Sequence, residues 1–199
     1  GVPLHKVLSE AGIAANGREV VFFGADHQEE DVPFRKEMFK VDQQFGRSVT
    51  RDEALAPEPL IAYALNGAPL TLQQGFPVRL VMPGWYGIAN VKWLAQVHVQ
   101  EQRYLGKFQA RMYRSLRGEM INGELKWKET EVTRLQLKSA IARVTREGSV
   151  HKVFGFALND GTPLRSVDVK IDDGPWQPAK LDPSHPKYSW KLFTFDWMG

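Results

Sequence analysis

The sequence predicts an α+β domain followed by an all-β domain. Over roughly the first 140 residues, short apolar strands alternate with short helical stretches, without the regular strand–helix–strand order of a parallel sheet. Farther along, alternating apolar and polar residues are separated by Gly-containing turns, a pattern typical of antiparallel strands. We therefore predict two domains, residues 1–140 and 141–199, with a partly antiparallel sheet in the first.

The first domain opens on a short predicted helix from Pro3 to Ala11. Leu4, Val7 and Leu8 recur on one face of it, which is the helical period of an amphipathic segment. A proline stands near the start and Gly12 directly follows the end, as expected for helix boundaries.

Four apolar segments of the first domain are predicted to be strands: Glu19–Phe23, Leu60–Leu65, Val78–Met82 and Val97–Gln100. The second of them ends at Asn66-Gly67, a strong signal for a tight turn between antiparallel strands. The intervening stretches are expected to be irregular: Asp26–Asp31 as a solvated loop, Phe45–Ser48 as a turn, and Gln102–Trp127 without regular structure.

The second domain is predicted to be a β-sandwich of immunoglobulin type. Val150–Leu158 and Val167–Ile171 have the composition and alternation of strands. A turn at Asp172–Gly174 leads from the second of these strands toward Trp176, so we expect a hairpin there.

Composition excludes several classes of function. The net charge is +3, from 26 basic and 23 acidic residues, and no basic stripe with interleaved aromatic residues suggests nucleic-acid binding. No apolar run is long enough to span a bilayer, so we expect no membrane partner. The 199 residues contain no cysteine, and the five histidines lack the spacing of metal ligands. We therefore predict no metal ligand within the chain.

The stretch from Gly75 to Leu94 carries the strongest signal for a binding site. Arg79 and Lys92 stand among apolar neighbours on either side of a Gly-Trp-Tyr-Gly turn, where an unpartnered cation is costly. An anionic ligand would satisfy them, because Arg binds phosphate-like groups bidentately. The alternative is that both point to solvent or pair with carboxylates such as Glu101. Trp85 is expected in the core, and the role of Tyr86 is left open.

Several motifs, in order, resemble the sulfite oxidase family of molybdenum enzymes. They are Gly-Val-Pro-Leu at the start, Phe23–Asp26, Leu60–Leu70 and Gly75–Leu94, and the resemblance runs to about Arg114. It implies a sulfite oxidase-like fold and a molybdenum–molybdopterin cofactor. The implied cofactor-binding residues are Asp26, Gln74, Arg79, Asn90, Val91 and Lys92. Gln74 departs from the family, which usually has a histidine there, and a glutamine cannot become cationic.

The same resemblance implies that Tyr113 is the active-site tyrosine. Its hydroxyl would lie near the metal's oxo ligands and an oxyanion substrate, and it can donate a hydrogen bond without carrying charge. The neighbouring Arg111 and Arg114 would steer an anion inward. Without the resemblance, a surface tyrosine on a basic loop is the simpler interpretation.

The last third resembles the dimerisation domain of molybdenum-cofactor oxidoreductases. The segments Val167–Trp176 and Tyr188–Phe193 carry this likeness. It implies a symmetric homodimer. We expect the chain to be a fragment cut at both sides, because its ends do not look like natural termini.

What the resemblance implies for function is oxidation of sulfite to sulfate by oxygen-atom transfer. The electrons would pass to a haem protein or cytochrome c, and by analogy with bacterial relatives the compartment would be the periplasm. In this family a cysteine thiolate ligates the metal, and it would precede Gly1, so we expect the chain alone to be inactive. The alternatives are a non-catalytic pterin-binding or assembly protein of the same fold, and a related sulfoxide reductase.

Overall fold

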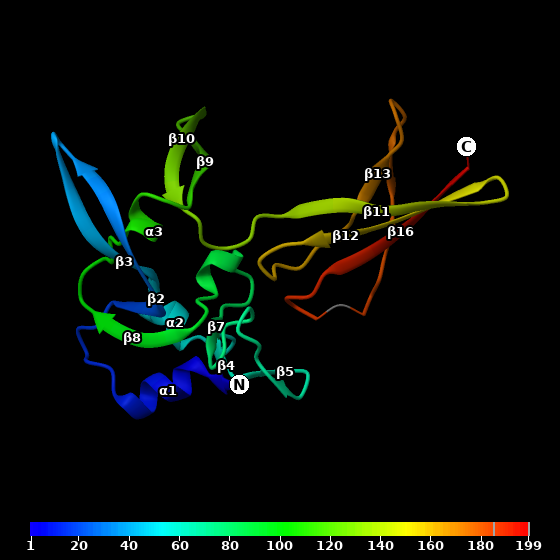
Figure 1. Ribbon diagram of the computed structural model, residues 1–199. Coiled ribbons are helices and arrows are strands. Elements are labelled where there is room, and N and C mark those ends of the chain that lie inside the picture. The colour runs from blue at the N-terminus through cyan, green and yellow to red at the C-terminus, as the bar shows by residue number, and fades with distance from the viewer. Residues whose placement is uncertain (185, 199) are drawn as a thin grey trace. The chain divides into compact units, whose positions relative to one another are not determined.

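The computed structural model describes residues 1–184 and 186–198 and divides the chain into two compact units (Figure 1). The units are Gly1–Thr133 and Arg134–Gly199. Helices and strands alternate irregularly in the first unit, and the described part of the second is built of strands, so the mixed, strand-rich class is confirmed. The domain limits at 140 and 141 stay a prediction.

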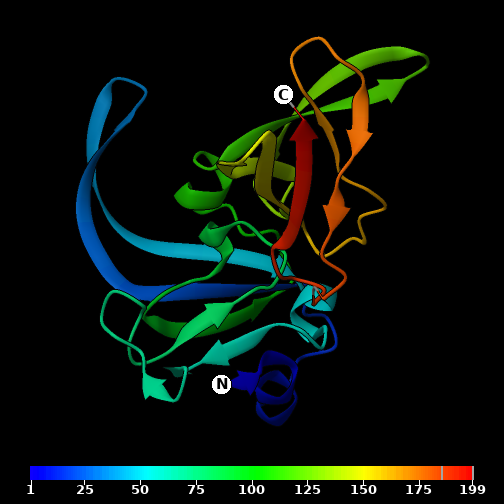
Figure 2. The same ribbon diagram turned by 90° about the vertical axis from the view of Figure 1, so that its right-hand side faces the viewer.

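The main sheet of the first unit has the strand order β3-β2-β8 and is antiparallel throughout. Its members are β2 (Glu19–Phe34), β3 (Glu37–Thr50) and β8 (Leu94–Gln100). β8 pairs only with the first part of β2, and the remainder of β2 continues with β3 as a two-stranded ribbon. We call residues 27–44 of this ribbon the arm; both views show it extending beyond the sheet (Figure 2).

The arm corrects two of the expectations. Asp26–Asp31 is not a loop but part of β2, since His27 to Phe34 pair with Gln44 to Glu37 across the hairpin. Its polar side chains do lie in solvent, and cross-strand ion pairs such as Lys40 to Glu29 (2.6 Å) bridge the two strands. Phe45–Ser48 is not a turn either, because it lies within β3 where that strand becomes buried.

Beneath the sheet, one hydrophobic core joins helix and strand residues. The helix α1 (Leu4–Ala11) contributes Leu4 and Leu8, as its predicted apolar face requires. Phe22 of β2 is fully buried in the same core, and Trp85 is buried there too, as predicted. The short helix α2 (Arg51–Leu55) follows β3 and begins with a capping box between Thr50 and Glu53.

A second, smaller sheet has the order β1-β4-β7, formed by β1 (Val2–Pro3), β4 (Leu60–Ala62) and β7 (Arg79–Val81). Between β4 and β7 lies a small hairpin of β5 (Ala64–Leu65) and β6 (Ala68–Pro69). Its turn is the predicted Asn66-Gly67, and both residues adopt positive φ, 51° and 81°. The 3₁₀-helix η1 (Gly87–Ala89) follows β7.

Gln102–Trp127 is more regular than expected. The short helix α3 (Lys107–Ala110) is followed by a hairpin of β9 (Arg114–Ile121) and β10 (Glu124–Glu131). The hairpin turns at Asn122-Gly123, again with positive φ at both residues, 53° and 82°. This is the same Asn-Gly turn signal as at Asn66-Gly67, so the expectation of an irregular segment here was wrong.

The second unit contains a four-stranded antiparallel sheet in the order β11-β12-β16-β15. These are β11 (Lys138–Glu147), β12 (Val150–Leu158), β16 (Lys191–Met198) and β15 (Lys180–Leu181). The predicted hairpin is present as β13 (Asp168–Lys170) and β14 (Trp176–Pro178). The hydrophobic core of the second unit is formed by Val153, Val169, Phe193 and Phe195. The immunoglobulin type of sandwich stays a prediction.

Within the described residues, none of the helices is long and apolar enough to cross a membrane.

Candidate functional site

Four of the predicted cofactor-binding residues line one hollow of about 230 Å³ in the first unit. They are Asp26 from β2 and Asn90, Val91 and Lys92 from the segment between η1 and β8. The remaining lining residues are Phe45, Gly87, Ile88 and Trp93. The hollow therefore combines one carboxylate and one ammonium with aromatic and aliphatic walls.

Backbone contacts hold Asp26 beside the Lys92 segment. The pairing of β2 is irregular just after Phe23, and the Ala25 N–H donates to the Trp93 carbonyl oxygen at 2.9 Å. A Cβ on Gly24 would collide with the Asp26 carboxylate and lie 3.1 Å from the Lys92 carbonyl oxygen. A larger residue at position 24 would therefore displace the Asp26 carboxylate and press on the Lys92 backbone.

The Lys92 ammonium is anchored rather than free. Its Nζ donates to the Gln73 carbonyl oxygen at 3.1 Å and lies over the Trp93 ring, 4.5 Å from the centroid. The Trp93 indole Nε1 donates to the Leu72 carbonyl oxygen at 2.9 Å. These hydrogen bonds connect the loop before β7 to Lys92 and Trp93, two residues that line the hollow.

Arg79 has an internal role that the sequence did not show. Its guanidinium donates to the carbonyl oxygens of Gln74 (3.0 Å) and Asn90 (3.2 Å), so it joins the loop before β7 to the segment after η1. Burial lowers the pKa of Arg79. Within the described residues, the Arg79 Nε is buried without a hydrogen-bond partner. An anionic ligand for Arg79 therefore stays a prediction, and Glu101, the carboxylate named in the alternative, hydrogen-bonds to Asn16.

Gln74 closes a turn of its own loop. Its side-chain oxygen accepts from the Thr71 N–H at 2.9 Å, and its own N–H donates to the Thr71 hydroxyl at 3.3 Å. Neither Gln74 nor Arg79 is among the residues that line the hollow. Both stay predicted as cofactor-binding residues, but their contacts in this structure support the loop that holds Lys92.

Tyr113 and its two arginine neighbours lie outside the hollow's lining. Tyr113 is 47% exposed and adopts a positive φ of 51°, a left-handed conformation uncommon for a tyrosine. Arg111 is exposed as well, whereas the Arg114 Nε donates to Glu129 at 2.9 Å across the β9–β10 hairpin. Arg114 is therefore engaged in an ion pair, and Arg111 is the arginine more open to an incoming anion.

A neighbouring hollow of about 410 Å³ leads from Asp26 toward the helix that precedes Tyr113. Asp26 lines both hollows, and the second is also lined by Lys107 and Phe108 of α3. The Phe108 ring packs on Phe45, with centroids 5.0 Å apart. Lys107 forms an ion pair with Glu30 of the arm. The two hollows are thus adjacent, and the second reaches α3, the helix that precedes Tyr113.

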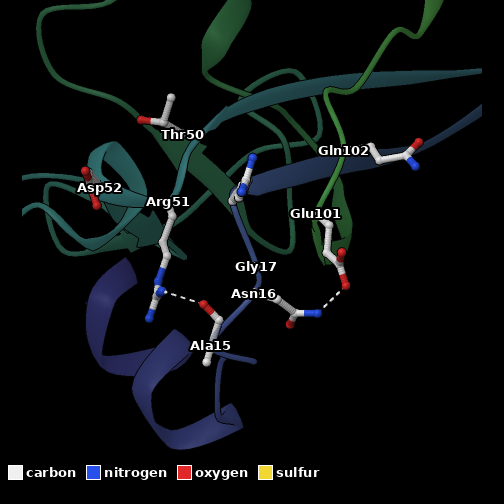
Figure 3. Close-up of a pocket in the computed structure, with 9 residues that line it drawn as sticks. Ala15, Asn16, Gly17, Thr50, Arg51, Asp52, Glu101 and Gln102 are labelled. Carbon is white, nitrogen blue, oxygen red and sulfur yellow. Dashed lines mark hydrogen bonds between the residues drawn. The ribbon is translucent and has the colours of Figure 1, made fainter.

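A hollow of about 620 Å³ lies elsewhere in the first unit and contains none of the predicted site residues (Figure 3). It is lined, mostly by polar residues, by the loop after α1, the junction of β3 and α2, and the residues that follow β8. Asn16 hydrogen-bonds to Glu101, and the Arg51 guanidinium donates to the Ala15 carbonyl oxygen at 3.3 Å. No motif in the sequence pointed to it. We take the Asp26 hollow as the candidate site because separate predicted motifs converge there.

Comparison with known proteins identifies the class of protein that this fold and site define. The family model "oxidoreductase molybdopterin binding domain" matches residues 1–108. The chain therefore belongs to the molybdopterin-binding oxidoreductase family. This confirms the resemblance to the sulfite oxidase family and the predicted molybdenum–molybdopterin cofactor.

Individual relatives include two kinds of enzyme. The chain is 31% identical to human mitochondrial sulfite oxidase, over 97% of the chain and 36% of that protein. It is 30% identical to nitrate reductase [NADH] 2 of Phaseolus vulgaris, over 94% of the chain and 22% of that protein. Among solved structures, the crystal structure of the sulfane dehydrogenase SoxCD from Paracoccus pantotrophus matches with a TM-score of 0.76 and 25% identity, covering 100% of the chain and 47% of that chain. The chain thus spans little more than a third of the sulfite oxidase that it matches.

The lining of the Asp26 hollow fits the organic part of this cofactor. Molybdopterin presents ring N–H groups, which can donate hydrogen bonds to a carboxylate such as that of Asp26, and a phosphate, whose charge an ammonium such as that of Lys92 can balance. Phe45 and Trp93 offer aromatic surface to a flat ring. Within the described residues no group of three or more His, Cys, Asp or Glu could hold a metal ion, and the chain has no cysteine. The residues present therefore fit the pterin, not the metal itself.

Tyr104, which precedes α3, provides a test of stability at high pH. Its ring packs edge-on against Phe23, and burial raises the pKa of the Tyr104 phenol, although the nearby Arg47 lowers it in part. Because the neutral phenol is favoured in the folded state, its contribution to stability is fully present below the ordinary pKa of 10.0. This contribution is lost as the pH rises through the folded-state pKa. Tyr104→Phe should therefore weaken the alkaline loss of stability, measured as the urea midpoint from pH 9 to 12. Parallel curves for the two proteins would show that the phenol is not desolvated.

Proposed function

We propose that the protein carrying this chain oxidises sulfite to sulfate with a molybdenum cofactor and passes the electrons to a haem protein or cytochrome c. The observation that carries the proposal is the meeting of Asp26, Asn90 and Lys92 at one hollow within the residues that match the family model. The likeness to human mitochondrial sulfite oxidase supports sulfite as the substrate.

The residues of the hollow would hold the cofactor by charge and shape. When bound, the molybdenum centre supplies two-electron oxygen-atom transfer. The Asp26 carboxylate would accept N–H groups of the pterin, and the Lys92 ammonium would offset the negative charge of its phosphate. Phe45 and Trp93 would flank the ring and exclude water. The hydrogen bonds of Arg79 to Gln74 and Asn90 would hold the loop before β7 against the segment after η1.

Tyr113 and Arg111 would serve the substrate. The Tyr113 hydroxyl would donate a hydrogen bond to a sulfite or sulfate oxygen, and the exposed Arg111 would attract the dianion. Arg114 would contribute less, because Glu129 already balances its charge. Homodimer formation through the second unit and a periplasmic location also belong to this proposal.

Nitrate reduction is a second candidate, favoured by the similarity to the nitrate reductase of Phaseolus vulgaris. The identities to the two kinds of enzyme, 31% and 30%, do not separate them. Both substrates are small oxyanions, so a tyrosine and an arginine suit either.

The test uses the full-length protein produced together with its cofactor. Pterin is measured by the fluorescence of its oxidised form, and turnover by sulfite-dependent reduction of cytochrome c or ferricyanide, with nitrate as the alternative substrate. We expect sulfite turnover. Nitrate turnover alone would favour the second candidate, and bound pterin without any turnover would favour a non-catalytic binding protein.

Site variants test whether the Asp26 hollow is the pterin site. Asp26→Asn and Lys92→Met each remove a charged hydrogen-bonding group worth about 1.5–3 kcal/mol, so pterin affinity should fall about 10- to 100-fold. Asp31→Asn and Lys36→Met make the same changes at exposed positions of the arm and should leave the pterin content unchanged. Equal pterin content in all four variants would show that the Asp26 hollow is not the pterin site.

A further inference from the structure

Arg47 is a buried cation that no sequence motif singled out. It lies in β3, is only 2% exposed, and donates from its two terminal nitrogens to the carbonyl oxygens of Phe108 (3.1 Å) and Val132 (2.6 Å). Burial lowers the pKa of Arg47, and the carboxylate of Glu131 raises it in part. A guanidinium is rarely buried on backbone carbonyls alone, so its position calls for a reason.

The two carbonyl groups that Arg47 binds belong to the segments on either side of Tyr113. Phe108 is in α3, which leads directly to Tyr113, and Val132 follows β10, the strand that returns beside it. The Val132 N–H in turn donates to the Tyr113 carbonyl oxygen at 2.9 Å. One guanidinium therefore connects the chain before Tyr113 with the residue that holds the Tyr113 backbone.

Ser48, which follows Arg47 in β3, hydrogen-bonds to Gln109, which follows Phe108 in α3. The side-chain oxygen of the buried Gln109 accepts from the Ser48 N–H at 2.8 Å, and its amide nitrogen donates to the Ser48 hydroxyl at 2.7 Å. The Ser48 hydroxyl donates to the buried Glu19 carboxylate at 2.9 Å. Arg47 and Ser48 thus hold Phe108 and Gln109 of α3 through three hydrogen bonds, and the second donor of Arg47 binds the Val132 carbonyl oxygen.

Tyr113 needs such support because of its backbone. A non-glycine residue at φ 51° persists only where its surroundings enforce that conformation, and such residues cluster at functional sites. The Tyr113 side chain is exposed, so the enforcement comes from the backbone contacts of its neighbours.

We propose that Arg47 is a positioning residue for Tyr113. By donating to the carbonyl oxygens of Phe108 and Val132, it fixes the position of the Tyr113 hydroxyl relative to the oxyanion substrate. The inference rests on the proposed function in taking Tyr113 as the substrate-binding residue. Lysine cannot replace Arg47, because an ammonium on a flexible stem does not present two parallel donors to two separate carbonyl groups.

The test compares Arg47→Lys with Arg51→Lys in the holoprotein. Arg51 also donates to a backbone carbonyl, that of Ala15, but that contact lies in the polar hollow away from the predicted site residues. Hydrogen exchange at the Val132 amide, which is bonded to Tyr113, should become at least 10-fold faster in Arg47→Lys and stay unchanged in Arg51→Lys. The pterin content should be the same in both. Unchanged exchange in Arg47→Lys would overturn the proposal.

A double-mutant cycle with Tyr113→Phe separates positioning from general destabilisation. Arg47→Lys should lower kcat about 10-fold in the wild-type background and have no further effect once the Tyr113 hydroxyl is absent. An equal effect of Arg47→Lys in both backgrounds would show that it does not act through Tyr113.

Gln109→Leu provides an independent variant if Arg47→Lys folds poorly. It removes the two hydrogen bonds between Gln109 and Ser48 and, like Arg47→Lys, should accelerate hydrogen exchange at the Val132 amide. If the protein turns over neither sulfite nor nitrate, the proposed function fails, and exchange at Val132 alone decides whether Arg47 holds the Tyr113 segment.

Discussion

Replacing Gly75 by alanine should release the cofactor and destabilise the first unit. Gly75 has a φ of 102°, which L-residues rarely adopt, so the backbone strain alone costs about 1–3 kcal/mol. A Cβ there would lie 2.8 Å from the Lys92 Cβ and 3.0 Å from its Cα, neither of which can rotate away. Lys92 would have to move with its backbone. We therefore expect a loss of pterin of at least 10-fold, measured as the pterin content of the purified protein.

Gly67→Ala is the matched control for this prediction. Gly67 also has a positive φ, 81°, in the turn between β5 and β6, but a Cβ there meets nothing within 4 Å. It should lower the free energy of unfolding through strain alone, by about 1–2 kcal/mol, and leave the pterin content unchanged. If Gly67→Ala lost as much pterin as Gly75→Ala, contact with Lys92 would not be the cause.

Phe22→Ala should have the largest effect on stability. Phe22 is fully buried in the core that also contains Trp85 and Val91, the residue next to Lys92. Truncation of a buried phenylalanine leaves a cavity and costs about 3–5 kcal/mol. Because the Lys92 segment packs on this core, we expect lower pterin retention as well. The free energy of unfolding is measured by urea denaturation.

Phe34→Ala makes the same change at an exposed position. Phe34 is 61% exposed on the arm, so its truncation should alter the free energy of unfolding by no more than about 0.5 kcal/mol. Similar losses for the two variants would mean that the arm contributes to the core more than its exposure indicates.

Local signals in the sequence predicted several elements well. The helix at Leu4–Ala11 follows from its apolar face and flanking Pro and Gly, and Val150–Leu158 forms a strand with the predicted limits. The turn at Asn66-Gly67 follows from the preference of those residues for positive φ. In each case neighbouring residues alone determine the conformation.

The arm was missed, and the β9–β10 hairpin was missed despite its Asn122-Gly123 turn signal, because their strands are recognisable only from pairing across the chain. Asp26–Asp31 is polar and acidic and has no apolar alternation, yet its backbone is satisfied by β3. In the β9–β10 hairpin, Trp127 lies opposite Gly118, and no apolar face is buried against the rest of the unit to make the pattern visible. Cross-strand partners cannot be identified from short-range periodicity.

The sequence by itself determined the family and the cofactor, because its motifs occur in order within residues that match the family model, 1–108. Only the tertiary structure decided which of the predicted site residues lie together and which atoms each of them contacts. It brings Asp26 to Asn90 and Lys92, while it places Arg79 and Gln74 in support of their loops. It also reveals Arg47 on the carbonyl groups beside Tyr113. The physical reason is that a buried cation is satisfied by backbone carbonyl groups, which every residue carries, so its partners leave no trace in the sequence.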